Sequence, residues 1–139
     1  MAEKVEFELV SPEELLMSQL VDMVVVPGGE GYYGVLAGHI PMITSVKPGA
    51  ICVYEENRVT DRIFVTGGFA EVTQERITVL VEGAVKVSEL NRTKVEQNLK
   101  DFREDVEDAK TDEEKAKATF NLLVAQAQMD AILEAASAH

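Results

Sequence analysis

Residues 91–120 read NRTKVEQNLKDFREDVEDAKTDEEKAKATF, and this stretch decides the architecture of the C-terminal part of the protein. Its apolar residues recur at spacings of 4, 3, 4 and 3, the period of an amphipathic helix with one buried stripe: Val95, Leu99, Phe102, Val106 and Ala109. Asn91 precedes the stripe, and asparagine is a favoured residue for capping a helix N-terminus. The stretch therefore predicts an amphipathic helix that begins after Asn91.

A second helix is predicted from Thr111 onward. The run Thr111-Asp112-Glu113-Glu114 has the form of a capping box, in which the threonine caps the helix and Glu114 reaches back. One apolar line follows, with further apolar residues beside it: Phe120, Leu123, Ala127 and Ala131, then Leu122, Met129, Ile132 and Leu133. Two helices joined by a short turn lie antiparallel, so residues 89–139 are predicted to form a helical hairpin.

The composition changes near Ser88. Residues 1–88 contain all 9 glycines and all 4 prolines, and the remaining residues include neither. Alternating or β-branched runs, separated by Gly and Pro, predict short strands at residues 5–10, 42–46, 50–54, 58–65, 69–73 and 77–82, with one or two more in 15–26. Residues 28–38, with five glycines, are expected to form a long loop. This pattern predicts an antiparallel β-sandwich or barrel over residues 1–88.

Charge and cysteine content exclude several classes of protein. The 139 residues carry a formal net charge of −12, which repels a phosphate backbone, so nucleic acid and anionic membrane surfaces are poor partners. Cys52 is the only cysteine, which fits a reducing compartment. The N-terminus has no apolar signal region, and the richest apolar run is too short to span a bilayer. We expect a soluble, cytosolic protein that meets membranes only through a partner.

No catalytic, cofactor or metal site is expected. Gly29–Gly34 matches GxGxxG, but Gly38 and Pro41 follow too closely for the helix that a dinucleotide site requires. His39 has no second metal ligand nearby, and we interpret it as a loop-anchoring or partner-contacting residue. The acidic residues in 104–108 lack the spacing of a calcium loop and are interpreted as a solvated helix face.

Three segments resemble the epsilon subunit of bacterial F-type ATP synthases, the counterpart of the mitochondrial delta subunit. The first contains, in order, Gly34-Val35-Leu36, Gly38-His39, Pro41 and Pro48-Gly49. Residues 64–72, FVTGGFAEV, and the opening VSPEEL of residues 10–15 are similar to two further family patterns. The resemblance covers the whole sequence and agrees with the division into a β-domain and a hairpin.

The resemblance implies a ten-stranded β-sandwich and a non-catalytic role at the foot of the central stalk. The protein would be present in a single copy, dock on the gamma subunit and touch the c-subunit ring, so that it turns with the rotor and couples proton flow to ATP synthesis. It would lie peripherally at the cytoplasmic face of the bacterial inner membrane. Residues carried over for partner contact are Glu30, Gly31, Tyr32, Gly38, His39 and Pro41.

Two departures from the family bear on regulation. Members that bind ATP carry a motif whose aligned residues here are Leu90, Asn91, Lys94 and Val95; Asn91 replaces the acid and Lys94 the arginine, whose planar contact lysine cannot reproduce. Inhibitory members press basic residues of the last helix against the catalytic beta subunit. Here no Lys or Arg follows Lys117, whereas Asp130 and Glu134 are acidic. Weak or absent ATP binding and a weak brake on hydrolysis are expected, although the hairpin remains a candidate contact for the beta and alpha subunits.

Two other interpretations are open from the residues alone. One is a free-standing β-sandwich adaptor whose helical hairpin serves as a dimerisation or partner-binding clip. The other is a small enzyme built around His39 with Tyr32 or Tyr33, but no nucleophile–base pair or paired carboxylates accompany that segment.

Overall fold

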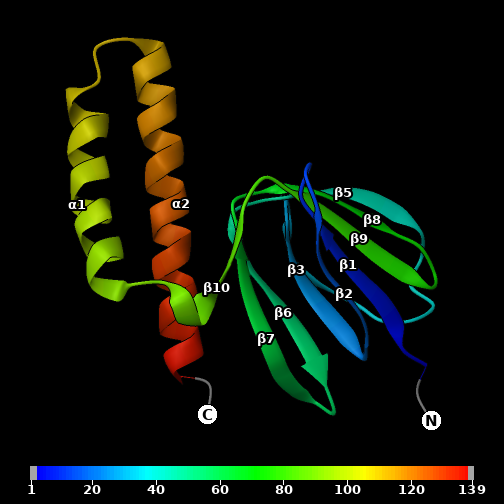
Figure 1. Cartoon of the computed structure of the whole chain (residues 1–139). Coiled ribbons are helices and arrows are strands. Elements are labelled where there is room, and N and C mark those ends of the chain that lie inside the picture. The colour runs from blue at the N-terminus through cyan, green and yellow to red at the C-terminus, as the bar shows by residue number, and fades with distance from the viewer. Residues whose placement is uncertain (1–2, 138–139) are drawn as a thin grey trace. The chain divides into compact units, whose positions relative to one another are not determined.

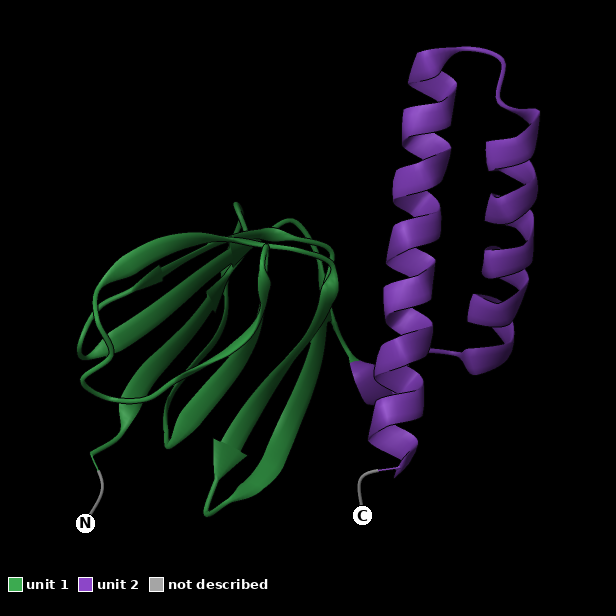
Figure 2. Cartoon of the chain, turned by 180° about the vertical axis from the view of Figure 1, so that it is seen from behind, with its two compact units in different colours: residues 1–86 green, residues 87–139 purple. Residues whose placement is uncertain are grey.

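The computed structural model describes residues 3–137 and divides into two compact units, Met1–Lys86 and Val87–His139 (Figures 1 and 2). The first unit contains ten strands: β1 (Val5–Val10), β2 (Leu15–Val21), β3 (Met23–Gly28), β4 (Gly31–Val35), β5 (Met42–Val46), β6 (Gly49–Glu55), β7 (Arg58–Val65), β8 (Gly68–Val72), β9 (Arg76–Val81) and β10 (Ala84–Lys86). The second contains a 3₁₀ turn, η1 (Val87–Glu89), and helices α1 (Arg92–Asp108) and α2 (Asp112–Ser137). The fold class of a ten-stranded sandwich followed by two helices is confirmed.

The strands pair in the order β10-β7-β6-β3-β5-β8-β9-β1-β2, with β4 added beside β3. β3 belongs to both layers of the sandwich, because it pairs with β6 along its first half and with β5 at Gly28. The expectation of antiparallel pairing throughout is wrong at one place: β1 and β9 pair in parallel, with Phe7 beside Ile77. Parallel neighbours need a long connection, and here most of the unit separates the two strands in the sequence.

The core lies between the two layers and follows from the alternation of side chains along each strand. In β1, Val5, Phe7 and Leu9 are buried, while the residues between them are half-exposed. The same period buries Ile77, Val79 and Val81 in β9. The core is built mostly from β-branched residues, which pack well on a pleated surface.

Residues 28–38 were expected to be a loop, but β4 forms inside this segment and makes a hairpin with β3. In this glycine-rich strand, burial still alternates from residue to residue, with Tyr33 half-buried and Val35 fully buried. A Cβ atom on Gly28 would lie 2.7 Å from the Tyr33 ring, so the absence of a side chain there admits the aromatic residue. Pairing with β3 and the burial of Val35 and part of Tyr33 therefore outweigh the low strand propensity of glycine.

The sequence pattern left the number of strands in residues 15–26 open at one or two. The structure has two, because the backbone turns at Asp22 between β2 and β3. β10 was not predicted, because it has only three residues and shows no clear alternation. β6 and β7 are joined through Glu56 and Asn57, both with positive φ, as a two-residue hairpin turn requires.

Both predicted helix starts are confirmed. Asn91 caps α1 by accepting a hydrogen bond from the Lys94 N–H at 3.0 Å. At α2 the Glu114 N–H donates to Thr111 Oγ1 at 3.1 Å, and Glu114 Oε2 accepts from the Lys110 N–H at 3.0 Å. The carboxylate thus reaches back one residue further than in the simplest capping box.

The two helices pack through a small core of Val95, Leu99, Ala125 and Met129, with Phe102, Leu122 and Ile132 at its edge. The predicted stripe of α1 is therefore correct at its centre. The first half of the apolar line predicted for α2 faces solvent, because Phe120 and Leu123 are 49% and 54% exposed, whereas Ala131 further along the line is buried. The face that packs on α1 is instead formed by Leu122, Ala125 and Met129.

Candidate partner-binding surfaces

The residues predicted for partner contact fall into two groups at opposite ends of β4. Glu30, Gly31 and Tyr32 lie at the turn between β3 and β4, whereas Gly38, His39 and Pro41 follow the other end of the strand. β4 has five residues, so the groups are separated by about 13 Å along the strand. They are therefore not one cluster.

The turn end of β4 borders a hollow between β4 and β5. The hollow has a volume of about 540 Å³ and is lined by Gly28, Gly29, Glu30, Gly31, Tyr32, Tyr33, Met42, Thr44 and Ser45. The Tyr33 hydroxyl and Thr44 Oγ1 lie 2.6 Å apart and tie the two strands across it. Glu30 is exposed and Tyr32 is 58% exposed, so this end presents a carboxylate and an aromatic ring to solvent.

The other end of β4 is anchored to the turn between β8 and β9. Gly38 has a φ of +88°, which glycine adopts readily, and its N–H donates to the Gln74 carbonyl oxygen at 2.7 Å. The His39 N–H donates to the Leu36 carbonyl at 3.2 Å, and its Nδ1 lies 2.7 Å from the Ile40 carbonyl oxygen. His39 is thus held by its own loop, which agrees with an anchoring role, while Pro41 is exposed.

The residues aligned with the ATP motif are engaged in building the start of α1. The Asn91 side-chain oxygen holds the Lys94 N–H, and Val95 is buried in the hairpin core. Leu90 is half-buried, and its N–H donates to the Val87 carbonyl at 3.1 Å. Of the four, the Lys94 side chain is the charged group exposed to solvent.

A third surface, not found from the sequence, is a row of apolar side chains on the outer face of the sheet. Cross-strand register places Phe69 opposite Leu80, Leu80 beside Val10, and Val10 opposite Leu15. Val10 is half-buried, while Phe69, Leu80 and Leu15 are 62%, 46% and 56% exposed. We call these four residues the apolar row. Exposed apolar side chains aligned across four strands are typical of a protein-binding surface.

An ion-pair cluster joins three segments elsewhere in the β-domain. Lys4 Nζ donates to Asp22 Oδ1 at 2.9 Å and to Glu55 Oε2 at 2.7 Å, and the Glu56 N–H donates to Asp22 Oδ2 at 2.7 Å. The hydrogen bond from Glu56 and the Lys4 ammonium lower the pKa of Asp22. The hydrogen bonds to Glu55 and Asp22 raise the pKa of Lys4. This exposed cluster ties the start of β1 to two turns.

Residues 3–137 lack two further kinds of feature. No group of three or more His, Cys, Asp or Glu side chains in this range is arranged to hold a metal ion. Neither helix in the described range is long and apolar enough to cross a membrane.

Both parts of the protein match known families. Residues 4–87 match the family described as "ATP synthase, Delta/Epsilon chain, beta-sandwich domain", and residues 91–139 match the family of the C-terminal domain of the ATP synthase epsilon subunit. An ATP synthase epsilon chain from Paramagnetospirillum magneticum is 53% identical over 132 residues, which span 95% of this protein and 99% of the relative. The ATP synthase epsilon chain of Rhodospirillum centenum is 53% identical over 137 residues, spanning 95% and 94%.

Solved structures with the same fold come from mitochondrial ATP synthases. A chain of the Euglena gracilis enzyme, solved as OSCP/F1/c-ring, superposes with a TM-score of 0.82 and 23% identity, covering 98% of this protein and 82% of that one. A chain of the central stalk/c-ring assembly of Tetrahymena thermophila gives a TM-score of 0.66 and 14% identity, covering 94% and 98%. At these identities the likeness concerns the fold alone.

Proposed function

The chain belongs to the ATP synthase epsilon-chain family, and from this premise we propose that it docks on the gamma subunit and touches the c-subunit ring as a part of the rotor. It is a non-catalytic subunit of the central stalk of F-type ATP synthase. In the proposed role it couples proton flow through the c ring to ATP synthesis. A stiff sandwich with a large buried core suits a part that must transmit torque.

The observation that carries gamma docking is the apolar row. Phe69, Leu80 and Leu15 are the kind of large side chains that a protein leaves exposed at the cost of solubility unless a partner covers them. Phe69 and Leu80 stand on β8 and β9, whose opposite faces contribute to the core, so this part of the surface is rigid before binding. A rigid apolar surface loses little conformational entropy on association, which favours a long-lived contact.

Paired substitutions test gamma docking. Phe69→Ser combined with Leu80→Ser is expected to weaken binding to a purified gamma subunit more than tenfold, because two buried anchors of an interface are lost. Leu123→Ser is the matched control, since it changes an equally exposed leucine on α2. Circular dichroism checks that each variant is folded. Unchanged affinity of the double variant would refute docking through the apolar row.

We assign the c-ring contact to the two ends of β4, around Glu30 and Tyr32 and around His39 and Pro41. Glu30 and Pro41 are exposed and Tyr32 is mostly so, while His39 anchors the loop that presents Pro41. In a Cys52→Ser background, Glu30→Cys should form a cross-link to the c subunit in the assembled complex. Glu56→Cys, in the turn between β6 and β7, is the control that should not. Equal cross-linking to the c subunit from both positions would contradict the assignment.

The hairpin is proposed to be a weak brake on ATP hydrolysis. In α2, Lys115 and Lys117 near its start are the basic residues, and the exposed charges further along are Asp130 and Glu134. Like charges at an interface with acidic segments oppose association. Removal of residues 89–139 should change the ATPase rate of the complex less than twofold. An increase of several-fold would contradict the proposal.

ATP binding at the start of α1 is proposed to be weak or absent. Asn91 already uses its side-chain oxygen to cap the helix, and Lys94 supplies a single ammonium in place of a planar guanidinium. Titration of the isolated protein with ATP should show no binding at micromolar concentrations. Saturable micromolar binding that Lys94→Ala abolishes would refute this.

The proposed location follows from the proposed assembly. As part of the F1 sector, the protein would lie at the cytoplasmic face of the bacterial inner membrane and be held there by its partners. Dissociation of the complex should release it from membranes together with a gamma-type subunit. Retention on membranes after the gamma subunit has left would contradict this location.

A further inference from the structure

The outer face that carries the apolar row also carries a band of charge, and both are set by the same strand register. Two residues along the strands from the apolar row, Glu71 lies opposite Thr78, and Thr78 lies beside Glu8. After another two residues, Arg76 lies beside Glu6. Side chains two residues apart on a strand share a face, so Glu71 is a direct neighbour of Phe69 on this surface.

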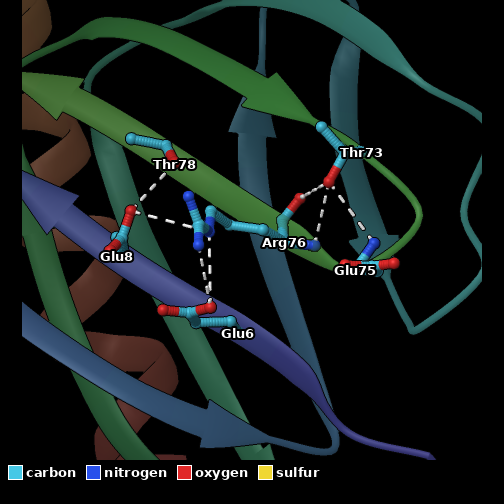
Figure 3. A network of polar contacts seen from close by, with 6 residues as sticks. All are labelled: Glu6, Glu8, Thr73, Glu75, Arg76 and Thr78. Atoms are coloured by element: carbon cyan, nitrogen blue, oxygen red, sulfur yellow. Dashed lines mark hydrogen bonds and ion pairs between the residues drawn. The ribbon is translucent and has the colours of Figure 1, made fainter.

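The charges in this band are unequally compensated, and Figure 3 shows the Arg76 side chain reaching both Glu6 and Glu8. Arg76 Nη2 lies 3.2 Å from Glu6 Oε2, and Arg76 Nε lies 3.9 Å from Glu8 Oε1. The Thr78 hydroxyl also donates to Glu8 Oε1, at 3.3 Å. One guanidinium is therefore shared between two carboxylates. Glu71 and Glu75 form no ion pair within 4 Å with any residue in the range 3–137.

A hollow of about 270 Å³ opens in the middle of this band. It is lined by Glu6, Glu71, Thr73, Glu75, Arg76 and Thr78. The Thr73 hydroxyl accepts hydrogen bonds from the Arg76 N–H at 3.1 Å and the Glu75 N–H at 3.3 Å, which fixes the turn at the end of the hollow (Figure 3). With Glu8 beside it, the band holds four carboxylates and one guanidinium, a net charge of 4 − 1 = 3 negative.

We propose that the protein partner that covers the apolar row places a lysine or arginine side chain in this hollow, paired with Glu71. The inference rests on the proposed function of the apolar row as a docking surface and specifies the partner's chemistry: an apolar strip bordered by basic residues. Phe69 and Glu71 are exposed neighbours on the same face of β8, so a partner seated on Phe69 comes close to Glu71. Removing a carboxylate from water without supplying a cation is unfavourable, so a partner surface with a basic side chain at this point is preferred over an uncharged one.

The carboxylates of the band have different roles. Glu6 and Glu8 already have Arg76, so they hold the arginine in place and gain less from the partner's cation. Glu71 is exposed, borders both the apolar row and the hollow, and is the residue that selects for a basic partner. Charged groups at the edge of an apolar contact act mainly on the association rate and on specificity.

The test compares Glu71→Gln with Glu56→Gln, which removes an equal charge from the turn between β6 and β7. Binding to a purified gamma subunit is measured at about 50 mM and 500 mM salt, between which the Debye length falls from about 14 Å to about 4 Å. Glu71→Gln should weaken binding three- to tenfold at low salt, mainly through slower association, and less at high salt. Glu71→Lys should weaken it more than tenfold, whereas Glu56→Gln should stay within twofold of the unaltered protein.

The outcomes distinguish this inference from the docking proposal. If Phe69→Ser with Leu80→Ser abolishes binding but Glu71→Gln behaves like Glu56→Gln, the basic partner is wrong and the docking face stands. If Glu71→Gln tightens binding, the hollow faces an uncharged or acidic surface and the inference is also overturned. If the double serine variant binds normally, the docking face itself is refuted, and the inference falls with it.

Discussion

The β-domain and the helical hairpin differ most in how much of each is buried. In the β-domain, seventeen apolar side chains of the described range form one core, including Phe7, Ile51 and Ile77 at 1% exposure or less. The hairpin core has four, Val95, Leu99, Ala125 and Met129, which are between 1% and 8% exposed. Helices gain most of their stability from such packing, so the packing free energy that opposes opening is far smaller in the hairpin than in the β-domain.

This difference suggests that the two units have different roles. A domain with one large core is rigid and presents its outer face in a fixed geometry, which suits permanent assembly. A hairpin with a small core and a long second helix opens or changes partner at a lower free energy, which suits contacts that come and go. Four substitutions test whether the two units really differ in this way, beginning with the largest expected effect.

Phe7→Ala should have the largest effect on the free energy of unfolding. Phe7 is fully buried in β1, and removal of a buried phenylalanine ring typically costs about 3–5 kcal/mol through lost transfer energy and a cavity. Urea denaturation followed by a β-sheet signal measures the cost. The matched control is Phe69→Ala, the same substitution on the exposed outer face, which should cost less than about 1 kcal/mol. Equal costs would show that the core and outer faces have been exchanged.

Leu99→Ala should weaken the hairpin without unfolding the β-domain. Leu99 is 7% exposed at the centre of the α1–α2 contact, and its truncation is expected to cost about 2–3 kcal/mol locally. Hydrogen exchange should accelerate for amides of α1 and α2 but not for those of β1 and β9. Leu123→Ala, on the exposed side of α2, should leave exchange unchanged. If Leu123→Ala has the stronger effect, the packing face assigned to α2 is wrong.

The packing face of α2 illustrates why some of the fold could not be predicted from sequence. Much of α2 is apolar on more than one side, so the lines through Phe120 and Leu123 and through Leu122 and Ala125 are equally plausible as patterns. Only contact with α1 decides between them. By contrast, α1 has a single apolar stripe and both helices begin with a clear capping signal, so the central packing residues of α1 and both helix starts were predicted correctly.

The β-domain shows the same limit at longer range. Alternation predicted β1 and β9, and bracketing by Gly, Pro or turn residues predicted β5, β6, β7 and β8, because both signals need only local information. The parallel pairing of β1 with β9 and the apolar row depend on register between strands that are far apart in the sequence. Val10, Phe69 and Leu80 belong to three such strands, so no local pattern reveals that they are neighbours. Glu30 and His39, close in sequence, were conversely separated by a strand hidden among glycines.

Thr111→Ala tests the capping box and should have a smaller effect than either core substitution. The change removes the oxygen that accepts from the Glu114 N–H, and loss of such a cap typically costs about 1 kcal/mol. The expected readout is fraying of the first turn of α2, seen as faster hydrogen exchange between residues 112 and 116. Thr119→Ala is the control, since it lies exposed within the helix, where alanine is the better helix former. Fraying in the control alone would contradict the assignment.

Asp22→Asn should have the smallest effect, and that effect should depend on pH. The hydrogen bond from the Glu56 N–H, at 2.7 Å, and the Lys4 ammonium, at 2.9 Å, hold the pKa of Asp22 below its ordinary value of 3.8. A carboxyl whose pKa is lower in the folded state stabilises the fold above its unfolded pKa and loses that contribution as the pH falls through the folded pKa. The unaltered protein should therefore exceed the variant in urea midpoint at pH 7, and the gap should close below pH 3.8.

The contribution of Lys4 to stability should show the complementary pH dependence, at high pH. Hydrogen bonds to Glu55 and Asp22 raise its pKa above 10.5, so its contribution is complete below that value and is lost as the pH rises through the folded pKa. Glu56→Gln is the control for both ends, because it keeps the backbone N–H that donates to Asp22 and changes only an exposed carboxylate in the same turn. A gap between Asp22→Asn and the unaltered protein that is constant from pH 7 to pH 2.5 would show that the carboxylate charge contributes nothing, and that the cluster joins the two turns to β1 by hydrogen bonding alone.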